Sequence, residues 1–137
     1  MSINITSIVL WILRITAALI MLQTLFFKFS GSEESIYIFS RLGVEPWGRI
    51  GTGILELVSS LLLLYPKTTF LGALLGTTLM AGAIGFHLTG LGIVVRGDGG
   101  LLFIYAMVVF IACFILLVIY RNELILFLKT LFRKSKL

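Results

Sequence analysis

The sequence is poor in the residue types that many redox and metal sites require. Only one of its 137 residues is cysteine and only one is histidine. The single Cys113 excludes an internal disulfide, a CxxC redox pair and a cysteine-based zinc site, and the single His87 excludes a haem held by two histidines. No GxGxxG segment opens a nucleotide-binding fold. We interpret Cys113 as a small buried hydrophobic residue and predict no metal site.

Charged residues are also scarce, at 12% of the chain, whereas 59% of the residues are hydrophobic. Four apolar runs, at about 5–29, 47–65, 70–88 and 101–120, are each long enough to cross about 30 Å of hydrocarbon. They show no alternation of apolar and polar residues, which argues against a β-barrel. The sequence therefore predicts an all-α fold, an integral membrane four-helix bundle that forms a single transmembrane domain over residues 1–137. Between the first two runs, residues 36–39 form a short amphipathic stretch suited to the membrane surface.

The net charge of +5 is concentrated behind the last apolar run. Residues 121–137 place leucine and phenylalanine at helical spacing among lysine and arginine, which predicts a basic amphipathic tail helix. This helix either lies along the membrane surface or extends the fourth span. Because the basic tail and Lys67 fall on one side, the positive-inside tendency predicts the cytoplasmic membrane with both termini in the cytoplasm. A basic cluster that directly follows an apolar helix does not indicate nucleic-acid binding.

One acid, Glu56, lies in the middle of the second apolar run. An ionisable side chain at that depth costs about 2.5 to 3.5 kcal/mol, so it should face protein, water or a ligand. Small and polar residues recur three, four or seven positions away from it on one helical face. That face should point into the bundle. Its members are Arg49, Thr52, Gly53, Ser59 and Ser60.

The first run offers two basic partners, Arg14 and Lys28. Counted from the cytoplasmic ends, Arg14 lies nine residues beyond Ile5 and Glu56 nine residues before Tyr65, so both should be about 13 Å deep. We therefore predict an Arg14–Glu56 ion pair, whose role is either to fix helix packing or to form part of a site.

Three further side chains fall near the opposite, exoplasmic ends of their spans. We predict that Lys28, Arg49 and His87, together with Glu56, bind a ligand. The alternatives are that Lys28 and Arg49 are anchors at the water interface and that His87 is a satisfied structural residue. In the third run, Gly72 and Gly76 share a face with His87, and this small-residue spacing lets helix backbones approach closely.

The order of these features resembles the DoxX family of small four-span membrane proteins. The resemblance runs over about residues 10–92, from "LRITAALIMLQTLFFKFSG" to "GAIGFHLTG". Its matching features are Arg14, Lys28, Leu42 with Gly43, the segment 51–56 before Pro66, and Ala83 with His87. It implies a four-helix bundle in the cytoplasmic membrane, with Arg14, Lys28, Glu56 and His87 as its polar positions. Members have been associated with quinone-linked sulfur oxidation and oxidative-stress complexes, and distant animal relatives look like assembly chaperones.

Two functions follow as hypotheses. The first is a binding or accessory subunit whose polar pocket holds a quinone or lipid-like molecule, with a redox protein as its partner. In it Lys28, Arg49 or His87 donates to a carbonyl or acidic head group. The second is a non-catalytic assembly factor for other membrane proteins, in which the internal charges serve packing alone. No cofactor motif indicates an independent enzyme, and any chemistry would come from a bound quinone or a partner.

Overall fold

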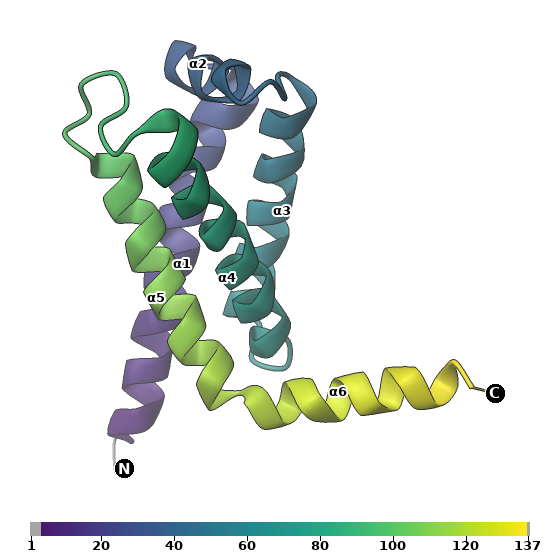
Figure 1. Ribbon diagram of the computed structural model, residues 1–137. Coiled ribbons are helices and arrows are strands. Elements are labelled where there is room, and N and C mark those ends of the chain that lie inside the picture. Colours follow the sequence, from purple (N-terminus) through teal and green to yellow (C-terminus); the bar gives the residue numbers. More distant parts are fainter. Residues whose placement is uncertain (1–3, 137) are drawn as a thin grey trace.

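The computed structural model describes residues 4–136, and its regular structure is helical (Figure 1). Residues 1–3 and Leu137, the end of the predicted tail, lie outside the described residues. Six α-helices follow one another, and a short π-helix, η1, continues the fourth. Their bounds are α1 Ile5–Ser30, α2 Glu33–Arg41, α3 Trp47–Leu64, α4 Thr69–Phe86, η1 His87–Leu91, α5 Leu101–Ile119 and α6 Arg121–Lys134.

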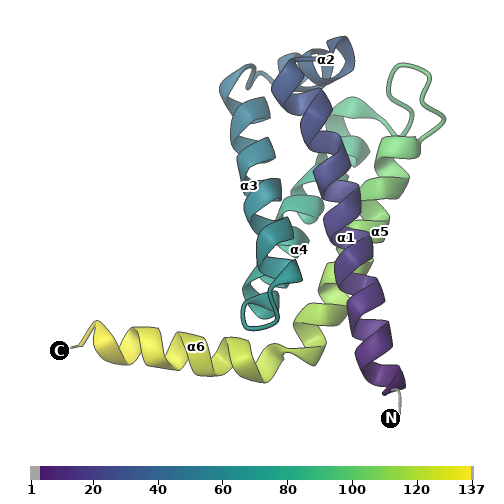
Figure 2. The ribbon, with the colours of Figure 1, turned by 180° about the vertical axis from the view of Figure 1, so that it is seen from behind.

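Four of these helices are long and apolar enough to cross a membrane: α1, α3, α4 with η1, and α5. Helix α1 packs against α3 and α5, and α4 packs against the same two helices. Neighbours along this ring run in opposite directions, so α1 begins and α5 ends at the same end of the bundle (Figures 1 and 2). The predicted all-α four-helix bundle is confirmed.

The turn between α1 and α2 is set by its local sequence. Gly31 adopts a left-handed conformation (φ 67°) that ends α1, and its N–H bonds to the carbonyl of Phe27. Glycine takes this conformation without steric cost. The next residue, Ser32, then caps α2 by accepting a hydrogen bond from the N–H of Ser35 at 3.2 Å. The chain therefore turns sharply, and α2 lies across the end of the bundle.

At the other end, where α3 turns into α4, the bundle is tightly closed. A Cβ atom on Gly72 would lie 2.5 Å from the backbone nitrogen of Leu63, and one on Gly76 would lie 2.6 Å from Sγ of Cys113. The hydroxyl of Ser59 donates to the carbonyl of Gly72 at 2.9 Å. Small residues on α4 thus bring α3, α4 and α5 into close contact, as the spacing predicts.

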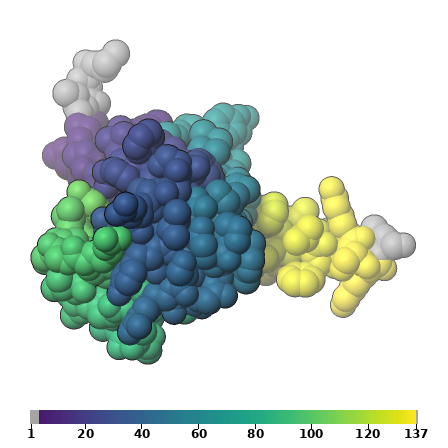
Figure 3. Space-filling model, turned by 90° about the horizontal axis from the view of Figure 1, so that it is seen from above, coloured from purple at the N-terminus to yellow at the C-terminus, as the bar shows by residue number. Residues whose placement is uncertain are grey.

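The end covered by α2 is more open. A Cβ atom on Gly82, only six residues beyond Gly76, would meet no other atom within 4 Å. Seen from above, α2 lies over this end of the bundle, between the green segment that leads into α5 and the blue start of α3 (Figure 3). The helices therefore spread apart beneath α2, and the space between them is the candidate site.

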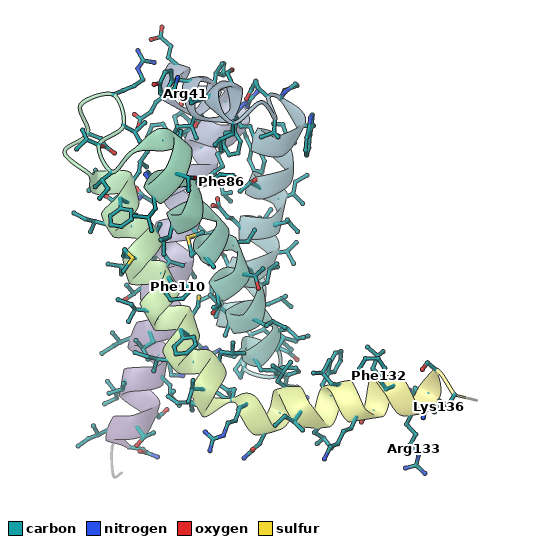
Figure 4. All side chains as sticks on the ribbon, viewed as in Figure 1. Arg41, Phe86, Phe110, Phe132, Arg133 and Lys136 are labelled. Carbon is teal, nitrogen blue, oxygen red and sulfur yellow. The ribbon has the colours of Figure 1, made fainter. Side chains whose placement is uncertain are left out.

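Helix α6 settles the two alternatives for the basic tail. The chain turns after α5, and α6 runs sideways away from the bundle (Figure 1), so it does not extend the fourth span. The ring of Phe127 contacts Phe70 of α4 with 5.6 Å between centroids. Phe132 lies on the bundle side of α6, whereas Arg133 points away from the bundle (Figure 4). This arrangement suits a helix lying at the membrane surface, with its apolar side toward the lipid.

Candidate functional site

The space beneath α2 is a cavity of about 650 Å³. Such a volume lies in the range of ligand pockets, about 300 to 1,000 Å³. All four bundle helices and α2 contribute to its wall, which is largely apolar. The polar side chains in the wall include three of the predicted site residues, Lys28, Glu56 and His87. The structure therefore brings most of the predicted ligand-binding set to one cavity.

Glu56 forms an ion pair with Lys28 at the wall of this cavity. Nζ of Lys28 lies 2.8 Å from Oε2 of Glu56, and the two side chains are 14% and 6% exposed. The hydroxyl of Thr24 accepts from Nζ of Lys28 at 3.0 Å, and its one hydrogen is shared between the same Glu56 oxygen, at 3.1 Å, and the carbonyl of Met21, at 2.8 Å. A neighbouring base and hydroxyl therefore offset part of the cost of burying this oxygen of the acid.

The face of α3 that carries Glu56 points inward, as predicted. Gly53, Ser59 and Ser60 are buried along with Glu56, and Thr52 lines the cavity. The hydroxyl of Ser60 donates to the carbonyl of Glu56 at 2.8 Å. The serines are thus satisfied by backbone oxygens, whereas the carboxylate depends on side chains of α1.

His87 stands at the start of the π-helical turn and is 6% exposed. Its Nδ1 lies 2.8 Å from the carbonyl oxygen of Gly92, and its ring meets Phe103 edge to face with 5.6 Å between centroids. Because a carbonyl only accepts, Nδ1 carries a hydrogen. Single π-turns of this kind recur at functional sites, and here the turn places a histidine in the cavity wall.

The predicted Arg14–Glu56 pair is wrong. Arg14 is buried, but its Nε donates to the carbonyl of Leu63 at 2.6 Å and its Nη2 to that of Leu64 at 2.9 Å. The guanidinium also lies over the ring of Trp11, 3.8 Å from the centroid. Arg14 therefore caps the last turn of α3, where backbone carbonyls lack helical partners and the helix dipole favours a positive charge.

The structure also places Arg49 outside the cavity wall, contrary to its predicted role as a ligand-binding residue. Its Nε donates to both carboxylate oxygens of Glu45, at 2.8 and 3.0 Å, and Nη2 lies 2.8 Å from the nearer one. Nη1 donates to the carbonyl of Lys28. Arg49 thus ties the end of α1 to the start of α3 and has its donors engaged there.

A loop from residue 92 to residue 100 closes one side of the cavity, and Asp98 organises it. The carboxylate accepts hydrogen bonds from the N–H groups of Val95, Gly100 and Leu102 at 2.9, 2.8 and 3.1 Å. Burial acts to raise the pKa of Asp98, but these backbone N–H groups outweigh it and the pKa lies below the ordinary value. Asp98 also lines the cavity.

The cavity reaches the outer surface of the bundle, because some lining residues are themselves exposed. One such group lies between α3 and α4 and includes Trp47, Thr78, Gly82 and Phe86. A second lies between α1 and α5 and includes Gln23, Phe27 and Leu101. These faces belong to helices that are long and apolar enough to cross a membrane.

Thr24 contacts both Lys28 and Glu56, and it was not among the predicted site residues. Its signal is the spacing of four residues to Lys28, which places the two side chains together on a helix.

Among residues 4–136, no group of three or more histidine, cysteine, aspartate and glutamate side chains is placed to hold a metal ion. The site offers hydrogen bonds and charge to a guest molecule, within largely apolar walls.

Comparison with known proteins finds one family. The family model of the DoxX-like family matches residues 12–119, which include all four spans except the first turns of α1. No curated protein and no solved structure matches the chain.

Proposed function

This chain belongs to the DoxX-like family, and we propose that it is a membrane-embedded binding subunit that holds a quinone or lipid-like molecule. The observation that carries the proposal is the 650 Å³ cavity, whose largely apolar wall contains the Lys28–Glu56 pair and His87. An apolar wall with a few converging polar groups is the usual form of a site for small amphiphiles. The head group lies near the charged pair, and the tail leaves between the helices toward the lipid.

The proposed orientation follows from charge. Lys67 and the basic tail lie at the closed end of the bundle, so this end faces the cytoplasm and holds both termini. The cavity then opens in the exoplasmic half of the cytoplasmic membrane. Redox chemistry, where it takes place, is supplied by the bound molecule and by a partner protein, and this chain supplies the binding site.

The test is analysis of the small molecules that the purified protein retains. Wild-type protein, extracted in mild detergent, should retain a quinone or one defined lipid, detected by mass spectrometry at about one molecule per chain. His87→Ala should retain much less, because His87 belongs to the cavity wall. Thr89→Ala is the matched control, since this exposed residue lies in the same π-turn but outside the cavity wall.

Recovery of nothing but bulk membrane lipid from all three proteins would contradict the proposal. That result would favour the alternative function, an assembly factor for other membrane proteins, in which the buried charges serve packing. Unchanged retention in His87→Ala, with a defined ligand present, would leave the cavity as the site but remove His87 from it.

A further inference from the structure

Glu56 and His87 each present one side-chain atom that has no hydrogen-bond partner among residues 4–136. The bonds to the Glu56 carboxylate end on Oε2, which leaves Oε1, and the bond of the His87 ring uses Nδ1, which leaves Nε2. In that part of the chain, every fully buried side-chain nitrogen or oxygen has a partner. Oε1 and Nε2 are therefore reached from the cavity, although Glu56 and His87 are only 5% and 6% exposed.

By their hydrogen-bond chemistry, an ionised carboxylate accepts at either oxygen, and a neutral histidine ring whose Nδ1 carries the hydrogen accepts at Nε2. The donors that the sequence suggested for the ligand are largely engaged with protein. Lys28 uses two of its three hydrogens on Thr24 and Glu56, and Arg49 is held by Glu45 outside the cavity.

We propose that the cavity selects amphiphiles whose head groups carry hydroxyls, over the corresponding carbonyl or ether compounds. This proposal rests on the proposed binding function and names the chemistry of its ligand. A hydroxyl beside the charged pair donates to Oε1 of Glu56, and its oxygen accepts the remaining hydrogen of Lys28. A carbonyl or an ether oxygen accepts from Lys28 but leaves Oε1 without a donor, which is unfavourable in an apolar surrounding.

The prediction extends to the redox state of a quinone ligand. A hydroquinone carries two hydroxyls, so one can bond to Glu56 while the other faces the wall that includes His87. Its oxidised quinone carries two carbonyls and its dimethyl ether two ether oxygens. Each of these offers only acceptor oxygens toward Oε1 of Glu56 and Nε2 of His87. The cavity should therefore hold the reduced form in preference to the oxidised one.

The experiment compares three probes with the same decyl tail: a hydroquinone, its quinone and its dimethyl ether. Binding to the full-length protein in detergent is measured anaerobically by equilibrium dialysis, with empty micelles subtracted. In wild-type protein the hydroquinone should bind about tenfold or more tightly than the ether, since a hydrogen bond to a charged group is lost. In Glu56→Gln this ratio should fall severalfold, because the charged acceptor is replaced by a neutral amide.

Glu123→Gln is the matched control, because it makes the same chemical change on α6 at an exposed position, and it should keep the wild-type ratio. Should Glu56→Gln not fold, His87→Phe takes its place, since a phenyl ring can keep the edge-to-face contact with Phe103 while removing Nε2. Its ratio should also fall.

Equal binding of all three probes would overturn the selection for hydroxyls while leaving the binding function intact. A preference for the hydroquinone that persists unchanged in Glu56→Gln and His87→Phe would overturn the assignment to these acceptors. No binding above empty micelles for any probe would remove both this proposal and the binding function.

Discussion

The Lys28–Glu56 pair should appear as a large coupling energy in unfolding experiments. The pair is 2.8 Å apart and 14% and 6% exposed, and removing one member of a buried pair typically costs about 3 to 5 kcal/mol. Because Lys28 keeps its bond to Thr24 and some exposure, we expect the low end, about 3 kcal/mol, for Glu56→Gln. In a Lys28→Gln background the same change removes a carboxylate that has already lost its base, so it should cost about 1 kcal/mol or less.

The assay is reversible unfolding in mixed micelles with increasing sodium dodecyl sulfate, followed by circular dichroism. The two single variants and the double variant give the coupling energy, which should be about 2 kcal/mol. Arg14→Gln combined with Glu56→Gln is the control cycle. Arg14 bonds to Leu63, seven residues beyond Glu56 and about 10 Å along α3, so these two effects should add within about 0.5 kcal/mol.

Additive losses for Lys28→Gln and Glu56→Gln would refute this account of the pair. Coupling between Arg14 and Glu56 in place of Lys28 would restore the pairing that the sequence suggested and contradict the observed arrangement of α1 and α3.

Three further predictions test the closed end, the loop and the tail. In the same unfolding assay Gly76→Ala should destabilise the protein by about 1 to 3 kcal/mol, because its Cβ would lie 2.6 Å from Sγ of Cys113. Gly82→Ala should leave stability unchanged, because its Cβ would meet no atom within 4 Å, and equal losses in the two variants would contradict the close packing of α4 at Gly76. The stabilisation from ionised Asp98 is complete above its ordinary pKa of 3.8 and is lost as the pH falls through its lower folded pKa, so thermal melts of Asp98→Asn should depend less on pH below about 4. With the native tryptophans replaced, Phe132→Trp should be quenched by lipids with brominated chains more strongly than Arg133→Trp, and equal quenching would contradict the surface position of α6.

The spans could be predicted because length and apolar composition decide them. The predicted runs 5–29 and 101–120 lie close to helices Ile5–Ser30 and Leu101–Ile119. The inward face of α3 was also predictable, since a charge in the middle of an apolar helix has few alternatives to the interior. Both inferences depend on one helix at a time and need no knowledge of how the helices are offset.

Which charged side chains pair with each other depends on how the helices are offset, and the predicted pairing of Arg14 with Glu56 was wrong for this reason. Equal depths for Arg14 and Glu56 were counted from Ile5 and Tyr65, as though both ends lay at one level. In the structure Arg14 is level with Leu63, so the first nine residues of α1 extend beyond the end of α3. This shift of about two turns moves Arg14 to the end of α3 and brings Lys28 to Glu56.

The prediction that Arg49 binds a ligand was wrong for a different reason. The carboxylate that binds its guanidinium in place of a ligand was visible in the sequence. Glu45 precedes Arg49 by four residues, a spacing that brings the two side chains together at the start of α3. The cavity itself has no such signal. It exists because α3 and α4 separate above Gly76, and that separation depends on α2 and on how the four spans tilt together.

The position of Glu56 follows from the same change in packing along the bundle. At the level of Ser59, α3 and α4 touch, and the serine hydroxyl is satisfied by the carbonyl of Gly72. One turn further toward α2, at Glu56, the backbones of α3 and α4 have begun to separate. Among residues 4–136, no carbonyl or N–H of α4 bonds to the Glu56 side chain. A longer side chain with its own charge, paired with Lys28 of α1, fills part of this space and leaves one oxygen facing the remainder. The acid therefore stands where close helix packing ends and the cavity begins.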